Sequence, residues 1–176
     1  MAMSSEPSFI VPPSGKTEAT SALPPLRPAV LVSEDGQTRF SILLLRWETA
    51  LLPCTRYDEW LVCHLSLTTL HDECAVEGPF LLRFEVEEIF NAAQKAALGN
   101  FSSFQSDFLE PVLTFQFQKE AVTGTLHAQI TLTPPEAPEN TAKREQISVQ
   151  MQVSPATLQA LCTPLAEQLE SFLSLL

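Results

Sequence analysis

The sequence has 176 residues, of which 45% are hydrophobic and 18% are charged, and these values are typical of one folded domain with a substantial core. Acidic residues outnumber basic residues by 21 to 10, so the formal net charge is -11. Binding to nucleic acid or to an anionic membrane surface needs Lys and Arg, and this balance argues against both. It favours a basic protein partner, although solubility alone also accounts for it.

The N-terminal segment is rich in Pro, Ser and Thr, and we predict a flexible arm at residues 1–27 before a single domain at 28–176. The segment has no basic stretch followed by a long apolar run, as a secretory signal would have. No later run is long enough to span a membrane, so the default prediction is a cytoplasmic protein. Four Cys in a chain of this length do not suggest a disulfide framework.

Strand patterns dominate the chain. Residues 29–48 predict two strands around a turn at 34–36, residues 58–69 predict a third, and residues 71–84 predict a turn and a return strand. Three later stretches alternate in the same way, at 111–118, 124–132 and 146–153, and a Pro-rich loop at 133–144 separates the last two.

Two segments have helical periodicity instead. In residues 86–100 the apolar side chains of Val86, Ile89, Phe90 and others form one stripe, and Gly99 is a natural stop. The last helix is predicted to begin with Ser154 as N-cap and Pro155 in its first position. Its leucine stripe contains Pro164, which we expect to kink it.

This order of strands, helix, strands and helix predicts an α+β fold. Two helices would cover the apolar face of one mostly antiparallel sheet in a two-layer arrangement, while the other face is exposed to solvent.

No residues form a convincing catalytic or metal site. His71 and Cys74 have a ligand-like spacing, but Cys63 and His64 are neighbours on a strand and point to opposite faces. The sequence has no nucleophile elbow and no glycine-rich phosphate loop. We therefore expect no enzymatic activity, no metal and no cofactor.

Two surface features remain as candidates for binding a protein. The first, which we call the polar plate, consists of the uncharged outward side chains of the three late strands: Thr114, Gln116, Gln118, Thr125, His127, Gln129, Thr131, Gln146, Ser148, Gln150 and Gln152. If these strands are neighbours in a sheet, the plate is either an ordinary solvent-exposed sheet face or a flat binding surface for a protein. The second feature is a set of acids around residues 58–88.

Trp60 stands beside two of these acids, where it would either anchor a basic partner or pack under a loop. The residues that we predict to contact a partner are Asp58, Glu59, Trp60, Asp72, Glu73, Glu77, Gln116, Gln118, Gln129, Gln150 and Gln152.

The order of segments resembles the WapI-like immunity proteins of bacterial contact-dependent toxin systems. The resemblance covers residues 38–175 and rests on "DEWLVCHLSL", a helix ending in "ALGN", then "FLEPVLTFQFQ" and "ISVQMQVSPATLQALCTPLAEQLESFL". Its most distinctive matches are Asp58, Trp60, Leu61 and Glu110. The arm and the Pro-rich loop are longer than is usual in the family, and Pro164 interrupts the last helix.

The resemblance implies a small cytoplasmic protein that binds and blocks a toxin domain, often a nuclease. The family has no shared catalytic residues, and its binding surfaces vary, so it transfers no contact residue. A protein partner, in particular a basic toxin domain, is thus expected, and neither nucleic acid nor membrane. The alternative is an adaptor or structural module of a bacterial secretion or signalling assembly.

Overall fold

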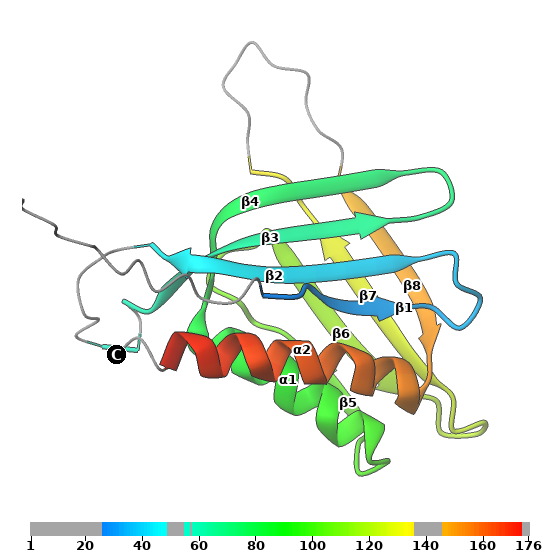
Figure 1. The fold of residues 1–176 in the computed structure, drawn as a ribbon. Helices are drawn as coiled ribbons and strands as arrows, with labels where there is room; N and C mark the ends of the chain where they lie inside the picture. The colour runs from blue at the N-terminus through cyan, green and yellow to red at the C-terminus, as the bar shows by residue number, and fades with distance from the viewer. Residues whose placement is uncertain (1–25, 49–54, 57, 136–145, 174–176) are drawn as a thin grey trace, which may run out of the picture.

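The computed structural model describes residues 26–48, 55–56, 58–135 and 146–173. Almost all of the predicted arm, and most of the Pro-rich loop, lie outside these residues. The described chain forms eight strands and two helices (Figure 1). In order they are β1 (Ala29–Val32), β2 (Arg39–Trp47), β3 (Trp60–Thr68), β4 (Glu73–Leu82), α1 (Arg83–Ala97), β5 (Ser103–Gln105), β6 (Leu113–Lys119), β7 (Leu126–Leu132), β8 (Ile147–Val153) and α2 (Pro155–Leu173).

The strands form two antiparallel sheets, each with its strands in sequence order. Sheet A contains β1 to β4 and sheet B contains β5 to β8. The α+β class is thus confirmed, but two sheets replace the single sheet that we expected. The strands alternate apolar and polar residues and so have one apolar face, and this alternation fits one large sheet as well as two smaller ones.

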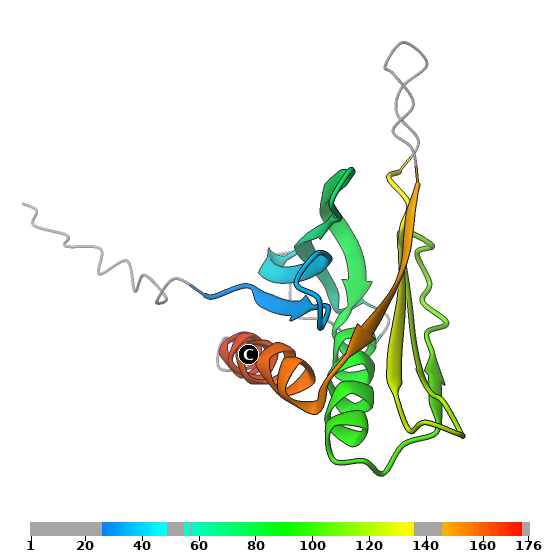
Figure 2. The ribbon, with the colours of Figure 1, turned by 90° about the vertical axis from the view of Figure 1, so that its right-hand side faces the viewer.

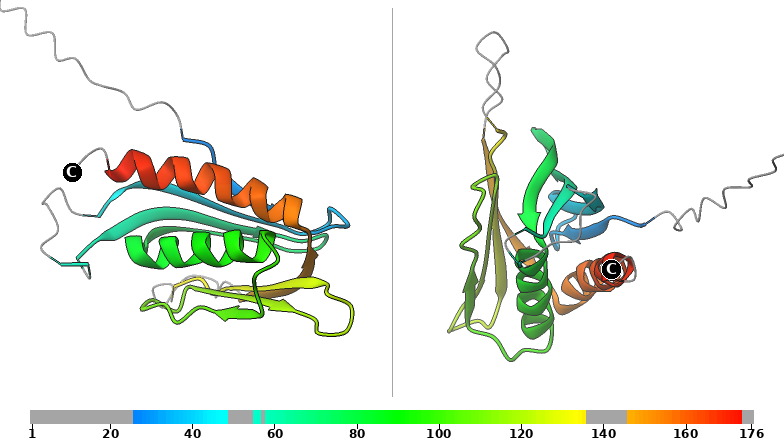
Figure 3. Two further views of the ribbon diagram at one scale, coloured as in Figure 1. Left: turned by 90° about the horizontal axis from the view of Figure 1, so that it is seen from below. Right: turned by 90° about the vertical axis from the view of Figure 1, so that its left-hand side faces the viewer.

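The two sheets and both helices share one core. Phe40 of β2 and Phe115 of β6 have ring centroids 5.4 Å apart, and this contact joins the inner faces of the sheets. Phe117 packs edge-on against Phe115 at 4.9 Å. Figures 2 and 3 show the helices side by side along one end of the space between the sheets, with α2 beneath β1 and β2.

Both helices begin and end for local reasons. Helix α1 starts directly at the end of β4, three residues before Val86, where the apolar stripe predicted its start. It ends before Gly99, whose φ of 79° suits the left-handed conformation common after the last residue of a helix. Helix α2 begins as predicted, because the Ser154 hydroxyl accepts the Thr157 N–H at 3.2 Å. It continues through Pro164, and its buried side chains, such as Leu161 and Leu165, follow the expected stripe.

Two buried polar side chains connect distant elements. The side chain of Gln168 in α2 accepts the Leu44 N–H at 2.7 Å, beside a bulge in β2, and donates to the Arg27 carbonyl at 2.7 Å. The Glu85 carboxylate in α1 accepts the N–H groups of Leu82 at 2.8 Å and Leu109 at 2.7 Å. Glu85 thereby ties the start of α1 to the loop that leads into β6.

Candidate functional site

The strands that carry the polar plate are neighbours in sheet B, so its side chains form one continuous surface. The register aligns Gln116, Gln129 and Gln150 in one row across β6, β7 and β8. A second row contains Gln118, His127 and Gln152, and a third contains Thr114, Thr131 and Ser148. Thr125 and Gln146 lie just outside the strand bounds.

Strand β5 extends the plate by one more strand, which the sequence reasoning missed. Gln105 lies opposite Gln116 and continues the glutamine row, and Ser103 lies opposite Gln118. Ser103 and Gln105 are exposed, while Phe104 between them is half-buried and packs against the core. This short alternation in "SFQ" was the available signal.

The polar plate is neutral although the protein is strongly acidic. Its side chains are exposed or half-buried, and none of them belongs to Asp, Glu, Lys or Arg. Strands lie about 4.8 Å apart and alternate residues about 7 Å apart, so the plate measures about 14 Å in each direction. One internal bond is present, between the hydroxyls of Thr131 and Ser148 at 2.8 Å.

Two of the predicted acidic contacts stabilise local structure. Asp58 accepts the Thr55 N–H at 3.1 Å and the Thr55 hydroxyl at 3.0 Å. Glu59 is mostly buried and pairs with the Arg83 guanidinium at 2.5 Å, and Arg83 also contacts Glu87 at 2.7 Å. The hydrogen bond that Arg83 donates to Glu59 is the main reason that the pKa of Arg83 is raised. These acids are therefore less free to meet a partner than the sequence suggested.

The remaining predicted contacts are spread over sheet A. Trp60 is half-buried at the start of β3, opposite Leu82. Glu77 is exposed in β4, where its carboxylate lies 3.8 Å from His64 Nδ1. Asp72 and Glu73 lie at the other end of β3 and β4, so the structure does not gather these acids into one patch.

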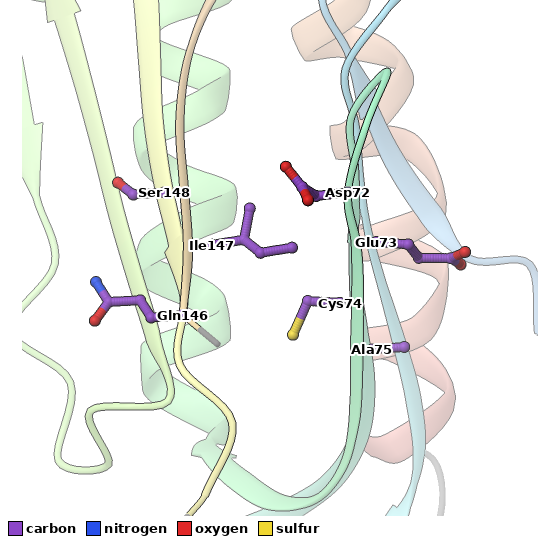
Figure 4. Close-up of a pocket in the computed structure, with 7 residues that line it drawn as sticks. All are labelled: Asp72, Glu73, Cys74, Ala75, Gln146, Ile147 and Ser148. Atoms are coloured by element: carbon purple, nitrogen blue, oxygen red, sulfur yellow. The ribbon is translucent and has the colours of Figure 1, made fainter. Parts of the chain in front are cut away.

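Asp72 and Glu73 instead line a pocket of about 620 Å³ between the two sheets. Its other wall is the start of β8, from Gln146 to Ser148, which carries one end of the polar plate. In Figure 4 the side chains of Asp72, Cys74 and Ile147 point into this gap, while Glu73 points away from it. Gln146 and Ser148 also point away from the gap, so β8 separates this pocket from the plate.

The three cysteines in the described part of the chain, Cys63, Cys74 and Cys162, are buried, while Cys54 lies outside it. Burial raises the pKa of Cys63 to about 12 and that of Cys162 to about 11, so both thiols stay protonated at neutral pH. Cys63 is fully buried and His64 half-buried, as expected for opposite faces of a strand. Within the described ranges, no group of three or more His, Cys, Asp or Glu side chains could hold a metal ion. No helix of the described chain is long and apolar enough to cross a membrane.

These features define a small α+β protein whose main surface features are a flat neutral sheet face and an adjoining acidic pocket. The chain belongs to the WapI-like immunity protein family, whose model matches residues 30–173. A comparison with curated proteins gave no match. Among solved structures, the chain is similar to the plant transcriptional regulator PBF-2, with a TM-score of 0.44, 10% identity and 86% of each chain covered.

Proposed function

We propose that this protein neutralises a cognate bacterial toxin domain by binding it in the cytoplasm, without catalysis of its own. Membership of an immunity protein family supports a role in immunity and a toxin as the protein partner. The observation that favours a sheet face as the contact surface is the glutamine row, one residue from each strand of sheet B: Gln105, Gln116, Gln129 and Gln150.

A neutral plate suits the centre of such an interface. Burying amides and hydroxyls against polar groups of a partner costs much less than burying unpaired carboxylates. The surrounding carboxylates, such as Glu34, Asp35 and Glu120, are exposed and contribute chiefly to the speed of encounter with a basic toxin. In this mechanism the plate covers the toxin's active cleft, and the acidic surroundings steer the toxin to it.

The polar plate is too small to form the whole interface. Its area of about 200 Å² follows from the strand spacing, whereas a stable complex buries about 800 Å² on each partner. Neighbouring surfaces must therefore contribute, such as the edge of β8, which lies between the plate and the pocket beside Asp72.

The test is a pull-down from native lysate, followed by co-expression of each captured candidate toxin domain with this protein. We expect to recover the C-terminal domain of a large toxin-like protein, and we expect this protein to suppress its toxicity. Recovery of secretion or scaffold components, with no toxin that this protein suppresses, would contradict the proposal and favour an adaptor.

A further inference from the structure

Strand β8 lies beside a groove that is closed at one end and open at the other. At the closed end, the Glu34 N–H donates to the Gln152 carbonyl at 3.0 Å, and the Gln152 amide donates to the Glu34 carboxylate at 2.6 Å. At the open end, the start of β8 and the start of β4 form the two walls of the pocket of about 620 Å³. Figure 2 shows the sheets separating toward the hairpin that joins β3 to β4.

The backbone of β8 presents a free edge to this groove. Strand β8 is the last strand of sheet B and pairs only with β7 among the described strands. The Gln152 carbonyl bonds to Glu34 and so faces away from β7. Backbone groups alternate in direction along an antiparallel strand, so those of Gln150 and Ser148 face the same way. Within the described chain, no backbone hydrogen bond joins either residue to a group outside sheet B.

Apolar side chains under this edge are incompletely covered. Ile147 and Val149 are only half-buried, whereas Met151 and Val153 further along the same face of β8 are 3% and 2% exposed. The difference matches the pocket at this end, which separates the start of β8 from the facing start of β4. In Figure 4, Ile147 and Cys74 point into the gap from opposite sides.

The walls of the groove carry negative charge. Asp72 points into its open end, and Glu34 and Asp35 line a second pocket of about 390 Å³ at its closed end. None of the described residues that line these two pockets is Lys or Arg. A second copy of this acidic chain would bring like charges together, so the charge favours a basic occupant.

We propose that the groove takes an extended, Lys- or Arg-bearing segment of the toxin partner, which adds to β8 as a fifth strand of sheet B. This proposal rests on the proposed function and extends it. The added strand bonds to the outward backbone groups of Ser148 and Gln150. Its apolar side chains face the gap and cover Ile147 and Val149. Its basic side chains lie on the opposite face of the added strand, where Glu34 bonds to the outward side chain of Gln152, and Asp72 adds to the negative potential of the groove.

The test uses two synthetic probes with blocked ends and the length of β8. One seven-residue peptide alternates valine with lysine, and the other has glutamate in place of each lysine. We expect the lysine peptide to shift the amide resonances of Ser148 and Gln150 in the isotope-labelled protein, and the glutamate peptide to bind at least about tenfold more weakly. Equal binding of both peptides, or shifts confined to other surfaces, would overturn the proposal.

A matched pair of variants separates the backbone edge from the side chain. Gln150→Pro removes an N–H that the β7 pairing does not use, and an edge strand tolerates proline at such a position. Gln150→Ala removes the same side chain but keeps the N–H. We expect Gln150→Pro to weaken lysine-peptide binding at least about tenfold relative to Gln150→Ala, with both variants folded by circular dichroism. Equal affinities of the two variants would refute strand addition.

Two further outcomes distinguish this proposal from the proposed function. If Gln150→Pro neutralises the toxin as well as Gln150→Ala does, strand addition is wrong while the immunity function stands. If the lysine peptide binds at β8 but no toxin is neutralised, the groove stands as a peptide site and the immunity function fails. Dimerisation through β8 without any peptide, detected by sedimentation, would show that the occupant is a second copy and would overturn the proposal.

Discussion

Replacing Glu85 should destabilise the fold, because its carboxylate holds two backbone groups in place. Glu85 is 1% exposed and accepts hydrogen bonds from Leu82 and Leu109. A buried N–H that loses its partner costs about 1–3 kcal/mol. Leu82 is fully buried and bears the full penalty, while Leu109 is 60% exposed, so water can replace part of its bond. We therefore expect Glu85→Ala to lower the unfolding free energy by about 2–4 kcal/mol.

Glu85 should also make the folded protein more stable as the pH falls, which is the reverse of the usual effect of a carboxylate. Burial raises the pKa of Glu85 above its ordinary value of 4.5, and the nearby carboxylates of Glu88 and Glu110 add to this, against the lowering effect of the two N–H groups. The folded state therefore holds this proton more tightly than the unfolded state does. The resulting stabilisation is fully present at a pH below the pKa that Glu85 has in the unfolded chain. It is lost as the pH rises through the higher pKa that Glu85 has in the folded protein.

The measurement is urea unfolding between about pH 8 and about pH 4.5, followed by tryptophan fluorescence. The wild type should gain stability relative to Glu85→Gln as the pH falls, because glutamine cannot take up a proton. The control is Glu170→Gln, which removes an exposed carboxylate from α2. A wild type that loses stability relative to Glu85→Gln on acidification, or a Glu85→Ala variant as stable as the wild type, would refute the reasoning.

Three further predictions concern other parts of the molecule. Gln168→Ala should lower the unfolding free energy in urea by about 2–4 kcal/mol, because the buried Leu44 N–H loses its acceptor and the Arg27 carbonyl loses its donor; a change under about 0.5 kcal/mol would contradict this. Pro164→Ala should raise the unfolding free energy by about 1–3 kcal/mol, because alanine restores a helical N–H, and a less stable variant would show that the proline fits its site better than alanine. Raising the salt concentration from about 50 mM to about 500 mM should slow toxin association in stopped-flow measurements and leave dissociation nearly unchanged, whereas a salt-independent association rate would exclude steering by the acidic surface.

The sequence predicts the outward faces of sheet B well, because strand alternation determines them locally. Leu126, Ala128, Ile130 and Leu132 were expected to point inward and are buried, so the side chains between them point outward. The start of α2 is equally local, since Ser154 and its neighbouring proline define it. The adjacency of β6, β7 and β8 was a hypothesis at the sequence level, and the register confirms it.

The division into two sheets could not be predicted in this way. It depends on which strands remain unpaired, and the alternation within β4 or β8 is the same at an edge as in the interior of a sheet. Contacts between distant residues were missed for a related reason. Glu59 pairs with Arg83 and Glu85 accepts the Leu109 N–H, each across 24 residues, and nothing in the local pattern of either acid indicates its partner.

The groove beside β8 also depends on tertiary geometry. Asp72 was selected from the sequence as an exposed acid, but its position opposite Ile147 follows from how the two sheets separate. Glu34, which closes the groove, was considered only as part of a turn. The sequence thus identifies several of the residues that matter at this surface, while the fold decides which of them act together.

The measurement that tests the central claim most directly compares toxin affinity between two Gln→Lys variants. Gln129→Lys places a charge at the centre of the polar plate, and Gln94→Lys makes the same change at an exposed position of α1. If the plate contacts the toxin, Gln129→Lys should weaken binding in calorimetry by at least about tenfold, or about 1.4 kcal/mol, because the lysine buries an unpaired charge or repels a basic toxin. Gln94→Lys should bind as the wild type does. Equal affinities of the two variants would contradict the account and place the toxin on another face.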